Sequence, residues 1–289
     1  LTMKILFYLI SLIPKSFIVI MVDVYIYLKI YKFFNFYKVT KVNLKIAYPD
    51  LSIDNIEQLS KLSIRESLIS VYETFYTWGR THIMTCSKIF KVKNNFLLKN
   101  KYDEGKGLIA VSIHNRSVDM LLKWINSQIR TVSLYKRVKN KHLDNFVKRN
   151  REHNGALCYE TSMLGVRKVL KALNNKKAVC FAADQVPKRG MGEYLNFYGR
   201  DAYSTTLVQS LAAKTKAIVM YLYINSTPTN FLTISIECCN SNIYNDSKHK
   251  LLLNNDIERI INKRPIDYAW EYKRFRRSPD PSLDPYKNI

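Results

Sequence analysis

The sequence predicts an α/β fold, with a mixed, mostly parallel sheet flanked by helices and an N-terminal hydrophobic membrane helix. Short apolar runs with the length of buried strands alternate with amphipathic helical patterns, and this alternation is typical of α/β domains. A longer apolar segment precedes them. No Gly-, Ser- or Pro-rich linker and no repeat divides the remainder. We therefore expect a membrane anchor helix at 1–38 and one domain at 39–289.

The first predicted element is the apolar segment 5–28, which is interrupted by Pro14, Lys15 and Asp23. At about 1.5 Å per residue it is long enough to cross the roughly 30 Å apolar core of a bilayer. Proline weakens a helix and charges are costly in a membrane, so an interfacial helix or a buried core helix is the alternative. Lysines follow this segment, and by the positive-inside rule they place the following domain in the cytoplasm: Lys29, Lys32, Lys38 and Lys41.

The second part of the chain supplies the strands and helices of the α/β domain. Because ligands of parallel sheets bind beyond the carboxyl ends of the strands, the residues directly after positions 113 and 183 are the expected location of the chemistry. Strands are predicted at 107–113, 131–135, 178–183, 217–223 and 231–238, and helices at 56–78, 118–127, 163–173 and 205–215.

Composition narrows the possible partners. Lys and Arg number 46 against 23 Asp and Glu, a formal charge of +23, which indicates a polyanionic partner such as nucleic acid or an anionic membrane surface. The five cysteines lack a C-x-x-C spacing and the five histidines lack an H-E-x-x-H motif. We therefore expect no disulfide framework, no metal and no cofactor.

A candidate site follows the first predicted strand. His114 comes directly after that strand, and Asp119 lies five residues on, where a helix begins. A carboxylate that holds one imidazole nitrogen enables the other nitrogen to take a proton from a bound hydroxyl group. The alternative is that Asp119 is a structural residue of the first helical turn.

This His-x4-Asp block resembles that of the lysophospholipid acyltransferase superfamily. Further blocks, similar in order and spacing over roughly residues 40–277, narrow the resemblance to the lipid A biosynthesis acyltransferases, which are lauroyl/myristoyl transferases. These blocks are NLKIAYP at 43–49, KALNNKKAVCFAADQ at 171–185, FYGRDAYST at 197–205 and PIDYAWEYKRF at 265–275.

The block at 114–119 departs from the family pattern. The family usually has H-F-G-N-W-E, whereas this chain has HNRSVD, which is closer to the H-x-S-x-x-D of glycerolipid acyltransferases. The alternative to a lipid A precursor as acceptor is therefore a glycerolipid acceptor. A nucleic-acid-binding protein is an alternative of another class, although the sequence has no RNP, zinc-finger or helix-turn-helix signal.

The resemblance implies an acyltransferase that moves a fatty acyl chain from acyl carrier protein, or acyl-CoA, to a hydroxyl of a lipid A precursor or related glycolipid. It implies attachment to the cell inner membrane and its lipids, with the catalytic domain facing the cytoplasm, and no nucleic-acid partner. The catalytic residues would be the base His114 and Asp119, which orients it. The substrate-binding residues would be Arg151, Arg149, Asp184 and Arg116.

Overall fold

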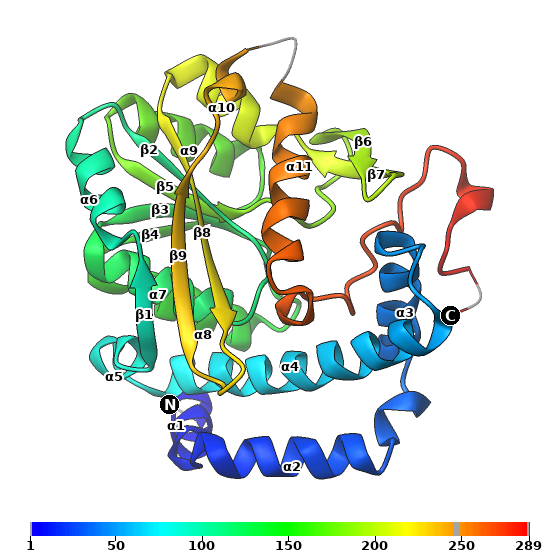
Figure 1. Ribbon diagram of the computed structural model, residues 1–289. Helices are drawn as coiled ribbons and strands as arrows, with labels where there is room; N and C mark the ends of the chain where they lie inside the picture. Colours follow the sequence, from blue (N-terminus) through cyan, green and yellow to red (C-terminus); the bar gives the residue numbers. More distant parts are fainter. Residues whose placement is uncertain (1, 246–248, 288) are drawn as a thin grey trace.

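The computed structural model describes every residue except 1, 246–248 and 288, and its centre is a seven-stranded sheet (Figure 1). Its strand order is β1-β9-β8-β2-β5-β3-β4, and every neighbouring pair is parallel except β8 and β9. The predicted mixed, mostly parallel sheet is therefore confirmed. The strands are β1 (Ile89–Lys93), β2 (Leu108–Ser112), β3 (Thr131–Tyr135), β4 (Leu157–Glu160), β5 (Ala178–Ala182), β8 (Ile218–Ser226) and β9 (Leu232–Cys238).

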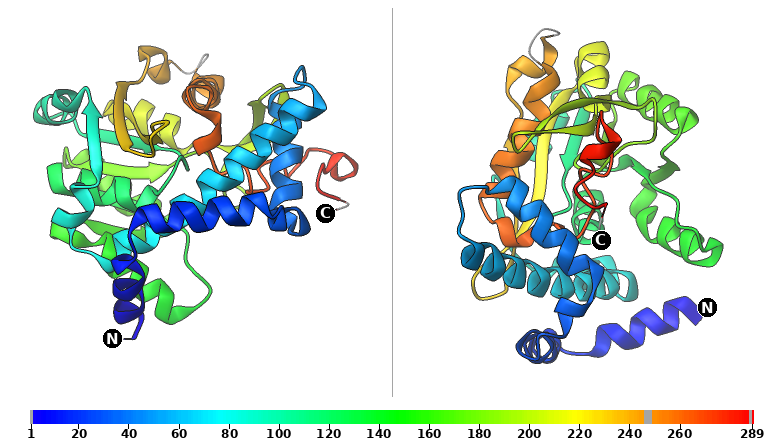
Figure 2. Two further views of the ribbon diagram at one scale, coloured as in Figure 1. Left: turned by 60° about the horizontal axis from the view of Figure 1, so that its bottom comes forward. Right: turned by 90° about the vertical axis from the view of Figure 1, so that its right-hand side faces the viewer.

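Helices cover both faces of this sheet, and a separate antiparallel hairpin, β6 (Gly192–Phe197) with β7 (Arg200–Thr205), lies beside α11 (Figures 1 and 2). The α-helices are α1 (Thr2–Leu12), α2 (Lys15–Tyr27), α3 (Asn35–Ala47), α4 (Ile53–Gly79), α5 (His82–Cys86), α6 (Asn95–Asp103), α7 (Val118–Gln128), α8 (Lys141–Arg151), α9 (Met163–Asn174), α10 (Leu207–Thr215) and α11 (His249–Asn262).

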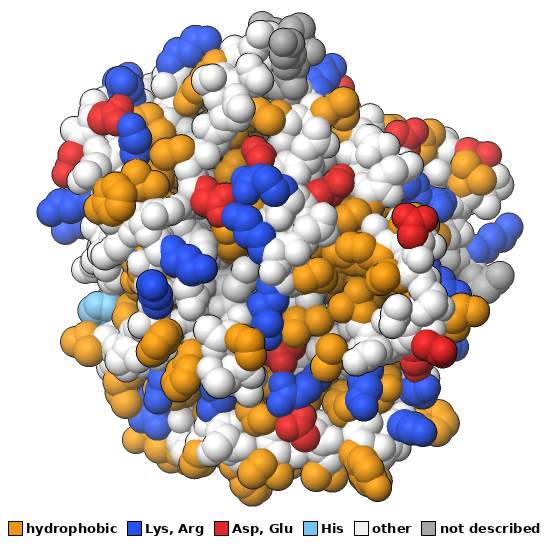
Figure 3. Space-filling view, in the orientation of Figure 1, with side chains coloured by type: hydrophobic (Ala, Val, Ile, Leu, Met, Phe, Trp, Pro, Cys, Tyr) orange, Lys and Arg blue, Asp and Glu red, His pale blue; other side chains and the backbone are white. Residues whose placement is uncertain are grey.

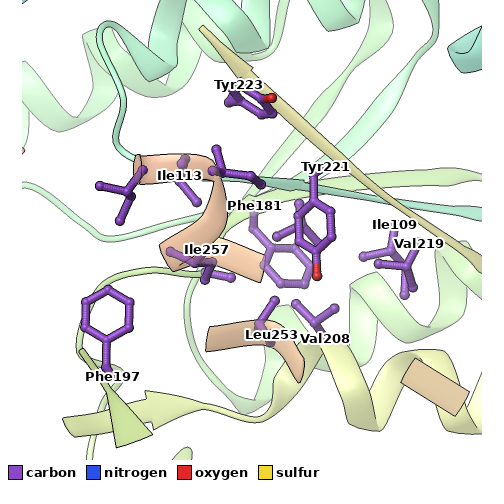
Figure 4. Close-up of a cluster of buried hydrophobic side chains, with 14 of the residues drawn as sticks. Ile109, Ile113, Phe181, Phe197, Val208, Val219, Tyr221, Tyr223, Leu253 and Ile257 are labelled. Atoms are coloured by element: carbon purple, nitrogen blue, oxygen red, sulfur yellow. The ribbon is translucent and has the colours of Figure 1, made fainter. Parts of the chain in front are cut away.

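The central strand β2 shows how the sequence divides the core. Successive side chains of a strand point to opposite faces. Ile109 and Val111 pack into one hydrophobic cluster, with side chains of α9, α10 and α11 (Figure 4). Leu108 and Ala110 pack into the other, with α4, α6 and α7. Because both faces of β2 are covered, the whole strand is apolar except for its last residue, Ser112.

The five predicted strands and the four predicted helices of the α/β domain are present, with ends that differ by a few residues. The sequence patterns missed shorter or more polar elements. Strand β1, for example, has an exposed or half-buried pattern with two lysines, and the polar helix α8 carries five basic residues when its histidine is included. The missed elements are β1, β4, β6, β7, α3, α5, α6, α8 and α11.

The expected continuous N-terminal helix is wrong. The segment forms two helices, α1 and α2, which meet at an angle of 86°, because Pro14 sits at the N-cap of α2 and its ring cannot continue a preceding helix. Among the described residues no single helix has the length and hydropathy of a membrane span, although the bent pair satisfies both criteria together. The expected boundary after residue 38 falls within α3.

Both helices pack along α4 (Figure 2). The ring of Phe7 lies 5.1 Å from that of Trp78, and Lys15 Nζ lies 2.8 Å from the carboxylate of Glu73. At Gly79 the two backbones approach so closely that a Cβ atom would lie 2.2 Å from the carbonyl oxygen of Phe7. A side chain at Gly79 would therefore push α1 away from α4.

Candidate active site

A cavity of about 560 Å³ lies at the carboxyl ends of β2 and β5. Its polar wall includes His114, Asp119, Arg151 and Glu271. Its apolar wall is formed by side chains of α4, α7, β3 and β5 and of the loop that follows β5, including Val71, Leu121, Leu122, Leu134, Phe181 and Val186. A polar group and an extended apolar chain can therefore occupy the cavity together.

His114 and Asp184 come together because β2 and β5 are neighbours. Ser112 pairs with Ala182 in this parallel ladder, so the residues two positions beyond each of them reach the same edge of the sheet. His114 Nδ1 lies 2.8 Å from Asp184 Oδ1. The Asp184 side chain is 1% exposed, whereas that of His114 is 31% exposed. The expected orienting partner, Asp119, is therefore wrong; the carboxylate that binds this imidazole is Asp184.

The pair sets the charge at the site. Burial lowers the pKa of His114, but the negative charge of Asp184 and its hydrogen bond outweigh this effect and raise the pKa above 6.5. Burial likewise raises the pKa of Asp184, and the charge of His114 outweighs it, so the pKa falls below 3.8. With Nδ1–H donated to Asp184, the neutral imidazole carries its lone pair on Nε2.

Asp119 has a different partner. It lies in the first turn of α7, which begins after the capping residue Ser117. Arg151 Nε and Nη2 donate to the two Asp119 oxygens at 2.7 and 2.9 Å, a bidentate geometry that fixes the guanidinium plane. Burial raises the pKa of Asp119, but the charge of Arg151 outweighs it, so the pKa is below 3.8. Arg151, an expected substrate-binding residue, lines the cavity beside Asp119.

Arg116, an expected substrate-binding residue, borders the cavity, and its guanidinium lies in a buried ion network. Its side chain is 0% exposed and donates to the carboxylates of Glu66 and Glu73. It also lies 3.5 Å from Asp267 Oδ1. The guanidinium thus donates to protein oxygens, which are the carboxylates of Glu66 and Glu73 and the carbonyl oxygen of Glu66. The Lys15–Glu73 ion pair connects α2 to the same network.

Arg149 is an expected substrate-binding residue that the structure places elsewhere. It is exposed on α8 and lines a second cavity, between α1, α5 and α8, that shares no lining residue with the cavity of His114. Arg149 and Arg151 are two residues apart on a helix, so their side chains leave it in different directions. Arg151 therefore lines the cavity of His114 and Arg149 does not; the substrate-binding role of Arg149 stays a prediction.

The chain segment after α11 holds the His114 turn in place. His114 O accepts a hydrogen bond from Ala269 N at 3.0 Å, and Asp267 O accepts one from Arg116 N at 3.0 Å. The Asp267 carboxylate in turn accepts hydrogen bonds from the backbone and side chain of Ser226, at 2.6 and 2.7 Å. The motif at 265–275 thus has a structural function, which its sequence alone did not reveal.

Glu271 is a cavity residue that the sequence analysis missed. It accepts a hydrogen bond from Ser67 Oγ at 2.7 Å, and its charge contributes to the raised pKa of His114. Burial raises the pKa of Glu271 above 4.5. Glu271 lies within the family-like block PIDYAWEYKRF at 265–275, and this position is the sequence signal that could have identified it. In the described ranges no group of three or more His, Cys, Asp or Glu side chains is placed to hold a metal ion.

The comparisons with known proteins agree on one family. The model of the bacterial lipid A biosynthesis acyltransferase family matches residues 3–277. A lipid A biosynthesis acyltransferase of Haemophilus influenzae is 21% identical over 258 residues, covering 85% of this chain and 80% of its own length. A lipid A biosynthesis palmitoleoyltransferase of Escherichia coli is 21% identical over 250 residues, covering 83% and 79%.

Proposed function

This chain belongs to the bacterial lipid A biosynthesis acyltransferase family and is an acyltransferase, and we propose that it moves a fatty acyl chain from acyl carrier protein, or acyl-CoA, to a hydroxyl group of a lipid A precursor or a related glycolipid. The observation that carries this proposal is the pairing of His114 with Asp184 at the wall of a cavity with a long apolar side.

His114 is the proposed general base. Its Nε2 takes the proton of the acceptor hydroxyl while the hydroxyl oxygen attacks the thioester carbonyl carbon. The resulting tetrahedral intermediate then expels the thiolate, and the imidazolium returns its proton to that sulfur. Asp184 keeps the proton on Nδ1 and stabilises the imidazolium. The transfer forms one ester bond and breaks one thioester bond, without a covalent acyl-enzyme.

Arg151 is the proposed stabiliser of the oxyanion that forms during attack. Its Nε and one N–H of Nη2 are occupied by Asp119, so Nη1 and the second N–H of Nη2 remain for substrate oxygens. A fixed cation directed at developing negative charge lowers the barrier more than a mobile one. Asp119 is accordingly a positioning residue that acts through Arg151.

Replacing Asp184 or Asp119 by Asn separates the proposed roles of the two carboxylates, since Asp184 acts on His114 and Asp119 acts on Arg151. We expect Asp184→Asn to reduce kcat/KM about 10²- to 10⁴-fold and to lower the pKa of His114. A base must be neutral, so wild-type activity falls as the pH drops through a His114 pKa above 6.5. In Asp184→Asn this acid limb moves to lower pH. Initial rates measured across pH 5 to 9 check both effects.

Asp119→Asn is the matched variant for this experiment. It weakens the hydrogen bonds that fix Arg151. We therefore expect lower activity, with the acid limb of the pH profile close to its wild-type position. An acid limb that shifts in Asp119→Asn and stays fixed in Asp184→Asn would assign the orienting role to Asp119 instead.

The glycerolipid acceptor is the second candidate, and the residues that favoured it now have structural explanations. Arg116 is held by buried carboxylates, and Ser117 caps α7 by accepting a hydrogen bond from Met120 N. Neither residue therefore argues for another acceptor. The test is to incubate detergent-solubilised protein with labelled acyl carrier protein and acyl-CoA donors and with lipid A precursors or lysophosphatidate. Product on lysophosphatidate alone would replace the first proposal by the second.

We propose that α1 and α2 attach the protein to the cell inner membrane, with the catalytic domain in the cytoplasm. Many large hydrophobic side chains of this bent pair are exposed, and hydrophobic atoms are visible along the lower edge of the molecule, where α2 lies (Figure 3). An apolar helix surface of this kind lies in the interface of a bilayer. The exposed large residues of the pair are Ile5, Leu6, Tyr8, Leu9, Leu12, Phe17, Ile20, Met21, Val24 and Tyr27. The net charge of +23 favours both an anionic membrane and an acidic carrier protein.

Charged substitutions on α2 test this attachment. Phe17 and Ile20 are 52% and 61% exposed, so the change should leave the fold intact. We expect Phe17→Glu combined with Ile20→Glu to reduce binding to anionic vesicles at least about tenfold, because each buried apolar side chain contributes about 1.5 to 3 kcal/mol. Vesicle flotation measures the bound fraction. Met163→Glu with Leu164→Glu, equally exposed on α9, is the control; equal losses in both double variants would contradict attachment through α2.

A further inference from the structure

The second cavity, which Arg149 lines, has a volume of about 1130 Å³ and a strongly basic wall. It lies between α1, the end of α4, α5 and α8. Four basic residues line it, Lys4, Arg80, Lys123 and Arg149, and none of its lining residues within the described chain is Asp or Glu. Three histidines complete the wall: His82, His142 and His153.

Several of these groups lack the partners that buried polar groups normally have. Lys123 is 6% exposed, and its Nζ donates to two uncharged carbonyl oxygens, Thr77 O at 2.6 Å and Arg80 O at 2.8 Å. Burial lowers the pKa of Lys123 to about 8. Arg80 Nε and His153 Nδ1 are buried without a hydrogen-bond partner among the described residues. Like charges gathered without a counter-charge are unfavourable unless an anion joins them.

Aromatic side chains also line this cavity. Phe146 of α8 stacks on Phe7 of α1 at 5.2 Å between ring centres, and Trp78 and Tyr8 also line the cavity. The guanidinium of Arg80 lies 5.1 Å above the ring of Tyr8. A ligand that fits must therefore combine a compact anion with an apolar portion. Phosphate oxygens suit guanidinium and ammonium donors.

We infer that this basic cavity binds a phosphorylated ligand, with its phosphate at Lys4, Arg80 and Arg149 and its apolar portion against the aromatic side chains. The site is separate from the cavity of His114, since the two share no lining residue. The inference does not depend on the proposed acyl transfer. A phosphate of this kind is supplied either by a lipid headgroup or by a soluble phosphomonoester.

Calorimetric titration of the full chain in detergent tests the site with three probes: pyrophosphate, phosphatidate in mixed micelles, and 4′-phosphopantetheine. We expect the double substitution Lys4→Ala and Arg149→Ala to weaken binding at least about 100-fold, because it removes two charge-assisted hydrogen bonds to the phosphate. Both side chains are exposed, so the fold should persist. The control is Arg167→Ala with Lys168→Ala, which removes the same amount of charge from an exposed part of α9.

Each outcome either tests the inferred site or identifies the source of its phosphate. Selective loss in the first double variant supports the site, and tighter binding of phosphatidate or of phosphopantetheine assigns the lipid or the soluble source. No binding of any probe by the wild type, or equal losses in both double variants, overturns it. His114→Ala should bind all probes like the wild type, so a failure of the proposed acyl transfer would leave this result unchanged.

Discussion

His114→Ala is expected to reduce acyl transfer about 10²- to 10⁴-fold or below detection, because it removes the only proposed base for the acceptor hydroxyl. The lost group is an imidazole that reaches the cavity from the end of β2 and whose partner, Asp184, is buried. Turnover of labelled acyl carrier protein on a lipid A precursor measures the effect. The loss should appear in kcat, since the imidazole acts in the transition state and contributes little to ground-state binding.

Folding must be measured on the same variant, because Asp184 loses its partner there. The rest of the turn keeps its backbone hydrogen bonds to the segment after α11, so circular dichroism and the thermal midpoint should stay close to those of the wild type. Near wild-type turnover by a folded His114→Ala protein would remove the proposed base and the mechanism with it.

Arg116→Ala is expected to destabilise the protein by about 3–5 kcal/mol, the cost of breaking a buried ion pair by removing one partner. The substitution leaves Glu66 and Glu73 buried, with side chains 4% and 3% exposed. Lys15 still reaches Glu73 and Arg65 still reaches Glu66, so each carboxylate keeps one cation and loses its hydrogen bonds from Arg116. The free energy of unfolding from denaturant titration, with the thermal midpoint beside it, measures the loss.

Arg259→Ala is the matched control, because Arg259 also contacts two carboxylates, Glu237 and Asp256, but is 46% exposed. Solvent-exposed ion pairs contribute about 0–1 kcal/mol. An Arg116→Ala protein with unchanged stability and lost activity would return Arg116 to the substrate, where the sequence analysis placed it.

The sequence predicted that His114 and Asp184 would lie at the edge of the sheet, but it did not predict that they would pair. Both His114 and Asp184 follow apolar runs of the right length for buried strands, and active residues of parallel sheets gather at that edge. Their pairing depends on β2 and β5 being neighbours, although 70 positions separate the two residues. No local pattern fixes the order of strands in a sheet. Asp119, five positions from His114, was therefore the nearer and mistaken choice.

The absence of a local pattern for long-range contacts also explains why the surroundings of Arg116 were not predicted. Arg116 lies in a polar loop sequence that is typical of exposed residues. Its carboxylate partners, Glu66 and Glu73, lie on α4, 50 and 43 positions earlier in the chain. Helix periodicity predicted α4 itself but not the burial of acidic groups on it. At the N-terminus, Pro14 indicated a weak point in the helix; the angle of the break depends on how α1 packs against α4.

The backbone hydrogen bonds that Ala269 and Asp267 make with the His114 turn bear on when the enzyme first becomes active. A nascent chain on the ribosome carries His114, the proposed base, long before Asp267 and Ala269 have been translated. Until they emerge, these two hydrogen bonds cannot form. We therefore expect a nascent chain that ends before residue 267 to consume no thioesters, which would couple the proposed activity to the synthesis of that segment.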